Sequence, residues 1–119
     1  MKTYQGKCHC GNISFSFKHD EIKSGIRCNC SFCIRRSAVM TDFAMPPEAL
    51  TIVVKEENSL GLYEFDSKVA HHYFCKKCGI YPFHQTYSMP GQYRVNLGCI
   101  DEIDTNKIEL TLFNGKELL

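Results

Sequence analysis

Near its N-terminus the chain reads GKCHCGNISF over residues 6–15. Cys8 and Cys10 stand one residue apart, and a glycine follows them directly. A glycine at this place lets the backbone fold under a metal ion without a Cβ in the way. From Ile13 to Phe17 apolar residues alternate with serines, which is the period of a half-buried strand. The stretch therefore predicts a cysteine-bearing turn that leads into a strand.

The same pattern returns in the second half of the chain, where residues 75–80 read CKKCGI. Two cysteines again precede a glycine and the start of a predicted strand. Zinc prefers thiolate ligands in a tetrahedron, and two close pairs on turns supply two ligands each. We expect the two pairs to form one closed, structural zinc site. Its ligands would be Cys8, Cys10, Cys75 and Cys78.

A third group of cysteines lies between these two, where residues 28–33 read CNCSFC. Cys28, Cys30 and Cys33 offer thiolates close together in the chain, and no glycine follows them. Three protein ligands leave one coordination position open, as in a catalytic or substrate-binding zinc site. A fourth ligand, such as Cys99 or a histidine, would instead close the site. If it is not a ligand, Cys99 is expected to be a small buried hydrophobe.

Counting cysteines alone allows other groupings. Cys8 and Cys10 together with Cys28 and Cys30 would also supply four ligands. We favour the division into four and three because the two pairs followed by glycine match each other. The pair in residues 75–78 also has the spacing of a thioredoxin-like redox motif, but that motif expects a βαβ setting that the sequence lacks.

Length and composition indicate one globular domain, residues 1–119, with 44% hydrophobic and 23% charged residues. The net charge is +1 and no basic stripe is visible, so we expect no nucleic-acid partner. Apolar runs are short and the N-terminal residues lack the apolar core of a signal peptide. We therefore expect no membrane association and a cytoplasmic location. In a reducing cytosol the eight cysteines indicate metal ligands rather than disulfides.

Short strand patterns separated by turn residues fill the rest of the chain, and no helix longer than two turns is predicted. An all-β fold is therefore expected. Ser31–Arg36 is expected to form one helical turn with Ser31 as its cap. Pro46-Pro47 should end an extended stretch, and Ser67-Lys68 should join the arms of a hairpin. The expected strands and extended stretches are residues 2–8, 12–17, 39–45, 50–55, 62–66, 69–74, 80–85, 93–97 and 108–113.

Three cysteine motifs with their flanks resemble the glutathione-dependent formaldehyde-activating enzyme family, which also contains centromere protein V. They are GKCHCGNISF (residues 6–15), CNCSFC (residues 28–33) and YFCKKCGIY (residues 73–81). The stretch NLGCID, residues 96–101, is also similar to the family pattern. The length of the chain and its GIYPFH segment, residues 79–84, are similar to a short branch of the family.

The resemblance implies a β-tent fold, in which stacked antiparallel sheets are pinned by a structural zinc. It implies two zinc ions, and a second site that is labile or empty is compatible with the resemblance. It also implies a carbon–sulfur lyase that condenses formaldehyde with glutathione to S-hydroxymethylglutathione, or catalyses a related reaction of a small thiol. The ligands it implies are Cys8, Cys10, Cys75 and Cys78 for the structural ion and Cys28, Cys30 and Cys33 for the catalytic ion.

A small acidic thiol such as glutathione needs cationic anchors, and Arg35 and Arg36 directly follow the middle cysteine group. The alternative for both arginines is a solvated surface position. His84 is our candidate for substrate contact and proton transfer, with a plain core or surface position as its alternative. His71 and His72 are neighbours on a predicted strand, so they should face opposite sides.

Five aromatic residues are expected to fill the core or to line an apolar cleft near the metals: Phe32, Phe74, Tyr81, Phe83 and Tyr87.

Two functions from different classes fit these features. The first is a zinc-dependent carbon–sulfur lyase that acts on a thiol–aldehyde adduct, with a small thiol such as glutathione as its partner. The alternative is a non-catalytic zinc-binding module for a macromolecular partner, and a thiol-based redox or metal-storage protein is a third reading. We favour the enzyme because three cysteines leave a metal position open for a thiol.

Overall fold

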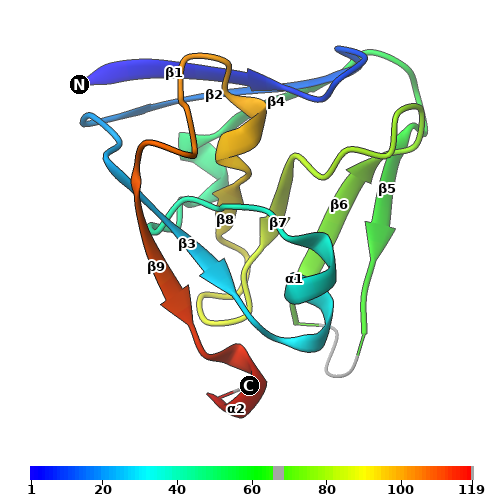
Figure 1. Ribbon diagram of the computed structural model, residues 1–119. Helices are drawn as coiled ribbons and strands as arrows, with labels where there is room; N and C mark the ends of the chain where they lie inside the picture. The colour runs from blue at the N-terminus through cyan, green and yellow to red at the C-terminus, as the bar shows by residue number, and fades with distance from the viewer. Residues whose placement is uncertain (66–68, 119) are drawn as a thin grey trace.

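The computed structural model describes residues 1–65 and 69–118 (Figure 1). In these residues the fold is mostly β, as the strand patterns predict, and helices are limited to short turns. The strands are β1 (Lys2–Lys7), β2 (Ile13–His19), β3 (Ser24–Cys28), β4 (Thr51–Val54), β5 (Leu60–Tyr63), β6 (His71–Cys75), β7 (Phe83–Gln85), β8 (Tyr93–Val95) and β9 (Glu109–Phe113). The helices are α1 (Ser31–Arg36), α2 (Gly115–Leu118) and the 3₁₀ turns η1 (Pro47–Ala49) and η2 (Leu97–Cys99).

The strands in the described part of the chain form three sheets. One antiparallel sheet has the order β1-β2-β4, and a second has the order β5-β6-β7-β8. The third consists of β3 and β9, which lie side by side in Figure 1 and pair in parallel, unlike the expected antiparallel arrangement. Parallel strands need a long crossover connection. Here the segment that connects β3 to β9 contains strands β4 to β8.

The observed strands differ from the predicted segments in two main places. The sequence pattern misses β3, because its five residues SGIRC do not alternate between apolar and polar types. The segment predicted as a strand from residue 80 becomes one only at Phe83, since Pro82 has no N–H for a strand ladder.

The segment 39–45, expected to be extended, bends at Asp42 and Phe43 and forms only isolated bridges, such as that of Met40 with Ile26. The predicted hairpin turn at Ser67-Lys68 and the end of its first arm at Asp66 lie outside the described residues.

The core joins the two antiparallel sheets through aromatic and aliphatic side chains. Phe15 of β2 meets Phe83 of β7 edge to face, with ring centroids 6.3 Å apart. This packing sets the β1–β2 turn opposite the β6–β7 turn, the two turns that carry the cysteine pairs. The large apolar side chains of this core are those of Tyr4, Ile13, Phe15, Phe17, Phe83, Val95, Leu97 and Ile100.

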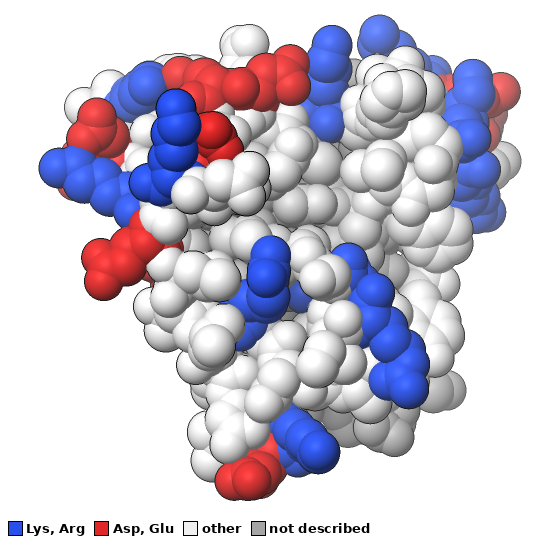
Figure 2. Space-filling view, in the orientation of Figure 1, with Lys and Arg blue, Asp and Glu red and all other residues white. Residues whose placement is uncertain are grey.

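The surface in Figure 2 carries acidic and basic side chains interspersed along its upper rim, with large uncharged areas between and below them. Among the described residues, no helix has the length and apolar character needed to cross a membrane.

Candidate metal centre

The two cysteine-bearing turns are similar, although the first is one residue shorter: the amide of Gly11 donates to the carbonyl oxygen of Cys8, and that of Gly79 to the carbonyl oxygen of Cys75. The amides of Cys8 and Cys75 each donate a hydrogen bond of 2.9 Å to the carbonyl oxygen five residues further along the chain. The glycines that close the turns, Gly11 and Gly79, have φ values of 81° and 80°. This left-handed region favours glycine over other residues. The repeated sequence pattern therefore produces a repeated turn, and each turn presents two sulfur atoms.

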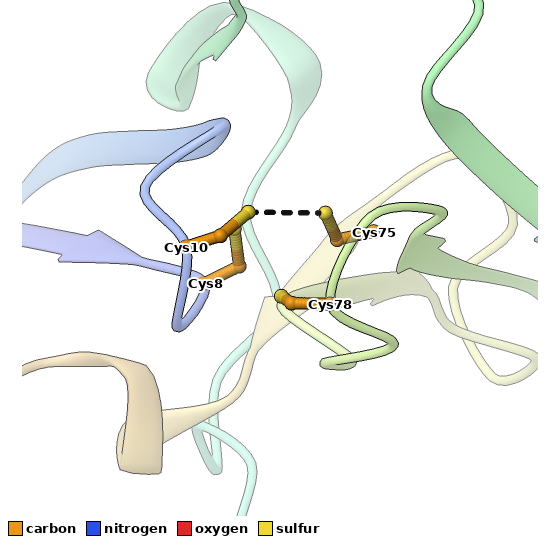
Figure 3. Close-up of side chains that lie close together, drawn as sticks. All are labelled: Cys8, Cys10, Cys75 and Cys78. Carbon is orange, nitrogen blue, oxygen red and sulfur yellow. Dashed lines mark hydrogen bonds between the residues drawn. The ribbon is translucent and has the colours of Figure 1, made fainter.

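Four cysteine sulfurs from the two turns come together, as Figure 3 shows. The Sγ atoms of Cys8, Cys10, Cys75 and Cys78 all lie within 4.8 Å of one another. The Sγ atom of Cys10 is 3.7 Å from that of Cys8 and 3.7 Å from that of Cys75. Zinc–sulfur bonds of about 2.3 Å in a tetrahedron place the sulfurs about 3.8 Å apart. The spacing of the sulfurs therefore fits a tetrahedral zinc ion.

The buried side chain of Asn12 supports this cluster through hydrogen bonds. Asn12 donates through Nδ2 to Ser59 Oγ at 2.7 Å and to Cys75 Sγ at 3.9 Å. Its Oδ1 accepts a hydrogen bond of 3.0 Å from the amide of Glu56. Such contacts orient metal ligands and fix their position in the fold.

The unequal pKa values of these thiols also indicate that a cation belongs between them. Burial opposes ionisation of Cys78, but N–H groups of Cys10 and Ile80 outweigh it and lower its pKa to about 6. The N–H of Asn12 favours ionisation of Cys10, but burial and the neighbouring thiols outweigh it and raise its pKa to about 11. Four thiols at this distance do not all ionise without a positive charge. A divalent ion that prefers sulfur, such as zinc, would supply that charge.

The second cluster lies where β3 leads into α1. The Sγ atoms of Cys28, Cys30 and Cys33 all lie within 4.8 Å of one another. The amide of Cys30 donates to Cys28 Sγ at 3.4 Å, and the amide of Cys33 donates to Cys30 Sγ at 3.3 Å. Cys30 is therefore the N-cap of α1, and the prediction of Ser31 as the cap is wrong. Ser31 already belongs to the helix, and a cysteine sulfur accepts the bond in place of the usual oxygen.

The structure keeps Cys99, the alternative fourth ligand, apart from this cluster. Among residues 1–65 and 69–118, no further cysteine, histidine or acidic residue joins the three sulfurs within the same distance. The Sγ atom of Cys99 instead lies 4.0 Å from the carbonyl oxygen of Tyr81, and burial raises its pKa to about 12. Three sulfurs without a fourth protein ligand are the donor set of an open zinc site.

The three thiols of this cluster differ in how easily they ionise. Burial opposes ionisation of Cys30, but N–H groups at the start of α1 outweigh it and lower its pKa. Burial raises the pKa of Cys33, against the effect of the nearby Arg36 charge. A metal-free cluster thus holds a more acidic thiol at Cys30 and a protonated thiol at Cys33.

The two candidate arginines lie in different environments. Arg35 is exposed, and its Nη1 donates to the carbonyl oxygen of Ser31 on the same helix. Arg36 is half-buried, and its Nη1 donates to Nδ1 of His84 at 3.1 Å. Its guanidinium carbon lies 4.1 Å from the centroid of the Tyr81 ring. The structure thus joins Arg36 and His84 in one network and leaves Arg35 on the surface.

The hydroxyl group of Tyr81 connects two buried histidines. It lies 2.5 Å from Nδ1 of His72 and 2.9 Å from Nδ1 of His84. Burial and the Arg36 charge lower the pKa of His72 to about 4 and that of His84 well below its usual value. Both imidazoles are therefore neutral at pH 7. Since arginine only donates, Nδ1 of His84 accepts and its proton lies on Nε2.

Sequence reasoning missed the role of this hydroxyl. Tyr81 is expected from the sequence only as an aromatic core or cleft residue, and no local pattern signals its two histidine partners. The prediction that His71 and His72 face opposite sides is confirmed. His71 pairs with Glu64 at 3.4 Å on the outer side, whereas His72 is buried beside Tyr81.

A cleft of about 510 Å³ adjoins α1. Of the five aromatic residues considered for such a cleft, Phe32, Phe74 and Tyr81 line it. Phe83 instead lies in the core, 1% exposed, because it points between the two antiparallel sheets. Tyr87 lies in the loop after β7 and is exposed. The other residues of the lining are Arg36, Ala38, Tyr63, His72, Gly79, Ile80 and Asn96.

The fold and the two cysteine clusters define a class of small β proteins with candidate metal sites made of sulfur ligands. The model of the family described as "Glutathione-dependent formaldehyde-activating enzyme" matches residues 3–116. The chain therefore belongs to this family, as its motifs predict. A crystal structure of a Rhodobacter sphaeroides protein is similar to this chain, with 32% sequence identity and a TM-score of 0.77. The match covers 90% of this chain and 99% of that chain.

Proposed function

We propose that the protein is a zinc-dependent carbon–sulfur lyase that acts on a thiol–aldehyde adduct, such as that of glutathione with formaldehyde. The family description names these two compounds. The observation that best supports the proposal is the three-cysteine cluster at the start of α1, a helix whose Phe32 and Arg36 also line the cleft. A reactive sulfur site and a place for substrate thus share one helix.

Two zinc ions belong to the proposal. The pairs on the two turns would hold a structural ion, and the cluster at α1 would hold the second. When bound there, zinc would stabilise the thiolate of an incoming thiol near neutral pH. The assigned ligands are Cys8, Cys10, Cys75 and Cys78 for the first ion and Cys28, Cys30 and Cys33 for the second.

The reaction forms or breaks one carbon–sulfur bond. In the direction of synthesis, the sulfur of a thiol that has lost its proton attacks the carbonyl carbon of the aldehyde. The electron pair of the C=O double bond moves to the oxygen, which takes up a proton to give a hydroxyl group. In the reverse direction the carbon–sulfur bond breaks and the aldehyde is released. No oxidant or reductant is needed.

The residues beside the cluster are assigned to substrate binding. Arg36 would hold an anionic group of the substrate with the N–H groups that His84 does not engage. His84 would act as a positioning residue, because its Nδ1 accepts a hydrogen bond from Arg36 and restrains the guanidinium group. Arg35 is the less favoured of the two arginines, since its side chain bonds back to its own helix.

The test is glutathione-dependent consumption of formaldehyde by the zinc-loaded protein and by a Cys30→Ser variant. Serine is similar in size but supplies no thiolate. The expected result is loss of most of the activity in the variant, while one zinc ion per chain is retained. Unchanged activity in Cys30→Ser would contradict the proposal.

A non-catalytic zinc module is the second candidate, and the apolar surface of β9 favours it. Leu110 and Leu112 on this strand are 39% and 74% exposed, so a macromolecular partner could cover them. Metal analysis separates the two functions. Two ions, one of them removed by a chelator and sensitive to added thiol, support the enzyme. Two tightly bound ions, or a single ion with no effect of thiols, support the module.

A further inference from the structure

The cleft beside α1 has a wall made mostly of aromatic rings. The ring of Phe32 has its centroid 5.4 Å from that of Tyr63 and 4.2 Å from that of His72. Tyr81 lies 6.0 Å from the same ring, and Phe74 extends the wall. Tyr63 is 48% exposed although it stacks on Phe32. Part of the aromatic wall is therefore free to be covered by a ligand.

Two polar side chains in this wall, those of Asn96 and Tyr81, already have partners inside the protein. Asn96 donates through Nδ2 to the carbonyl oxygen of Tyr81 at 2.8 Å and accepts through Oδ1 from the amide of Gly98 at 2.9 Å. The hydroxyl of Tyr81 is taken by the two histidines. A ligand with many polar groups would lose hydrogen bonds to water here and gain few in return.

Arg36 is the one cation among the described residues that line the cleft, where Nε2 of the neutral His72 is also buried without a hydrogen-bond partner. Its Nη1 is used by His84, but its buried Nε has no hydrogen-bond partner in the part of the chain that the structure describes. Its guanidinium group lies over the ring of Tyr81 and near that of Phe32, which restrains its plane. A guanidinium held in this way has N–H groups left for a single carboxylate.

The cleft and the three-cysteine cluster share the helix α1, although none of the three cysteines is among the described residues that line the cleft. Phe32 and Arg36 are four residues apart on this helix and share one face, and Cys33 lies between them in the chain. A ligand bound to Phe32 and Arg36 would therefore contact the same helix that carries Cys33.

We infer that the cleft selects a thiol that carries one aromatic ring and one carboxylate. The ring lies against Tyr63 and Phe32, the carboxylate binds Arg36, and the sulfur points toward the three-cysteine cluster. The inference rests on the proposed function and narrows its substrate class. A peptide thiol with two carboxylates, such as glutathione, fits this wall less well, because its second carboxylate would lose water without gaining a cation from the described lining.

Calorimetric titration of the zinc-loaded protein tests this selectivity. The two main probes, 2-mercapto-3-phenylpropanoate and 2-mercaptopropanoate, differ only in the phenyl group. Burial of that group is expected to tighten binding about tenfold or more, and glutathione is expected to bind more weakly than the phenyl compound. Equal affinities of the two main probes would overturn the inference and leave the proposed function intact.

A probe without sulfur separates the inference from the proposed function. If 3-phenylpropanoate binds as tightly as 2-mercapto-3-phenylpropanoate, the contacts of the ring and the carboxylate are as inferred, but no thiol is selected, which contradicts the proposed function and the thiol part of the inference. If 3-phenylpropanoate and the phenyl thiol both fail to bind, the inference is overturned.

Two exposed neighbours on β5 provide a matched pair of variants. Tyr63 and Leu62 are both 48% exposed, but only Tyr63 lines the cleft. Because both side chains are largely in solvent, truncation to alanine should preserve the fold, as circular dichroism can verify. Tyr63→Ala should lose most of the advantage of the phenyl compound, and Leu62→Ala should keep it. Retention of the full advantage in Tyr63→Ala would overturn the inference.

Discussion

Cys10 and Cys75 are 65 residues apart in the sequence, yet their sulfur atoms lie 3.7 Å apart. The contact joins the β1–β2 turn to the β6–β7 turn and hence one antiparallel sheet to the other (Figure 3). A metal ion at this point would close a long loop, where such a constraint stabilises most in principle. Structural zinc contributes roughly 10–16 kcal/mol in zinc-finger peptides, as much as the total stability of a typical domain.

Removal of one cysteine from each cluster should have different consequences. Cys78→Ser removes a proposed ligand of the ion that joins the sheets, so we expect loss of soluble, folded protein. Cys33→Ser changes the cluster at α1, which joins no two sheets, so the protein should remain folded. Soluble yield and circular dichroism measure the difference. Equal loss of folded protein in both variants would contradict this division between the clusters.

The hydrogen bonds of Asn12 should contribute measurably to stability. Asn12→Ala removes its bonds to Ser59 and Cys75 and leaves the amide of Glu56 without this acceptor. We expect the free energy of unfolding to fall by about 2 kcal/mol. Urea denaturation measures the change, with the exposed Asn106→Ala as the control. A loss no larger than that of the control would show that this support is unimportant.

Substitutions of the two adjacent arginines should have different effects on KM in steady-state kinetics. Arg36→Ala removes the proposed anchor for the substrate anion, so KM for an acidic thiol should rise severalfold or more while zinc content stays the same. Arg35→Ala removes an exposed side chain that bonds to its own helix, and its KM should remain that of the wild type. If KM were the same in both variants, Arg36 would not be an anchor for the substrate.

Protonation of His72 should destabilise the fold in mildly acidic solution. Burial and the Arg36 charge lower its pKa from 6.5 to about 4. The unfolded chain therefore binds this proton more readily than the folded chain. The contribution of His72 to stability is complete above about pH 6.5 and is lost as the pH falls toward 4. His84, whose pKa is also lowered, acts in the same direction.

The measurement is the free energy of unfolding of the wild type and of His72→Phe between pH 4 and 7. The variant should show a flatter pH dependence in this window, because one of the two histidines no longer titrates. Titration of the cysteines is common to both proteins and cancels in the comparison. Identical slopes would show that His72 is not held neutral in the fold.

The sequence predicts the features of the site that are local in the chain. Each cysteine group spans a few residues, and the glycine after Cys10 and Cys78 indicates the turn that the structure contains. The aromatic alternation of β2 predicts its buried face in the same way. Local spacing and backbone requirements were sufficient for these features.

Features that depend on partners distant in the chain were missed. β3 has no alternating pattern of its own and pairs with β9, which comes more than half the chain later. The network of Arg36, Tyr81 and His84 joins α1 to the segment after the second turn, and no spacing rule connects these residues. The cap of α1 is a local exception: the sequence predicts Ser31 because serine is a usual capping residue, whereas the sulfur of Cys30 accepts the bond.

The central claim is that the cluster of Cys28, Cys30 and Cys33 is an open metal site for a thiol. The most direct measurement is the absorption spectrum of the protein with cobalt(II) in place of zinc, recorded with and without glutathione or 2-mercapto-3-phenylpropanoate. We predict sulfur-to-cobalt bands from two sites, of which one changes on addition of thiol and is missing in Cys30→Ser. A spectrum that no thiol changes, with both ions bound in the wild type, would contradict the account.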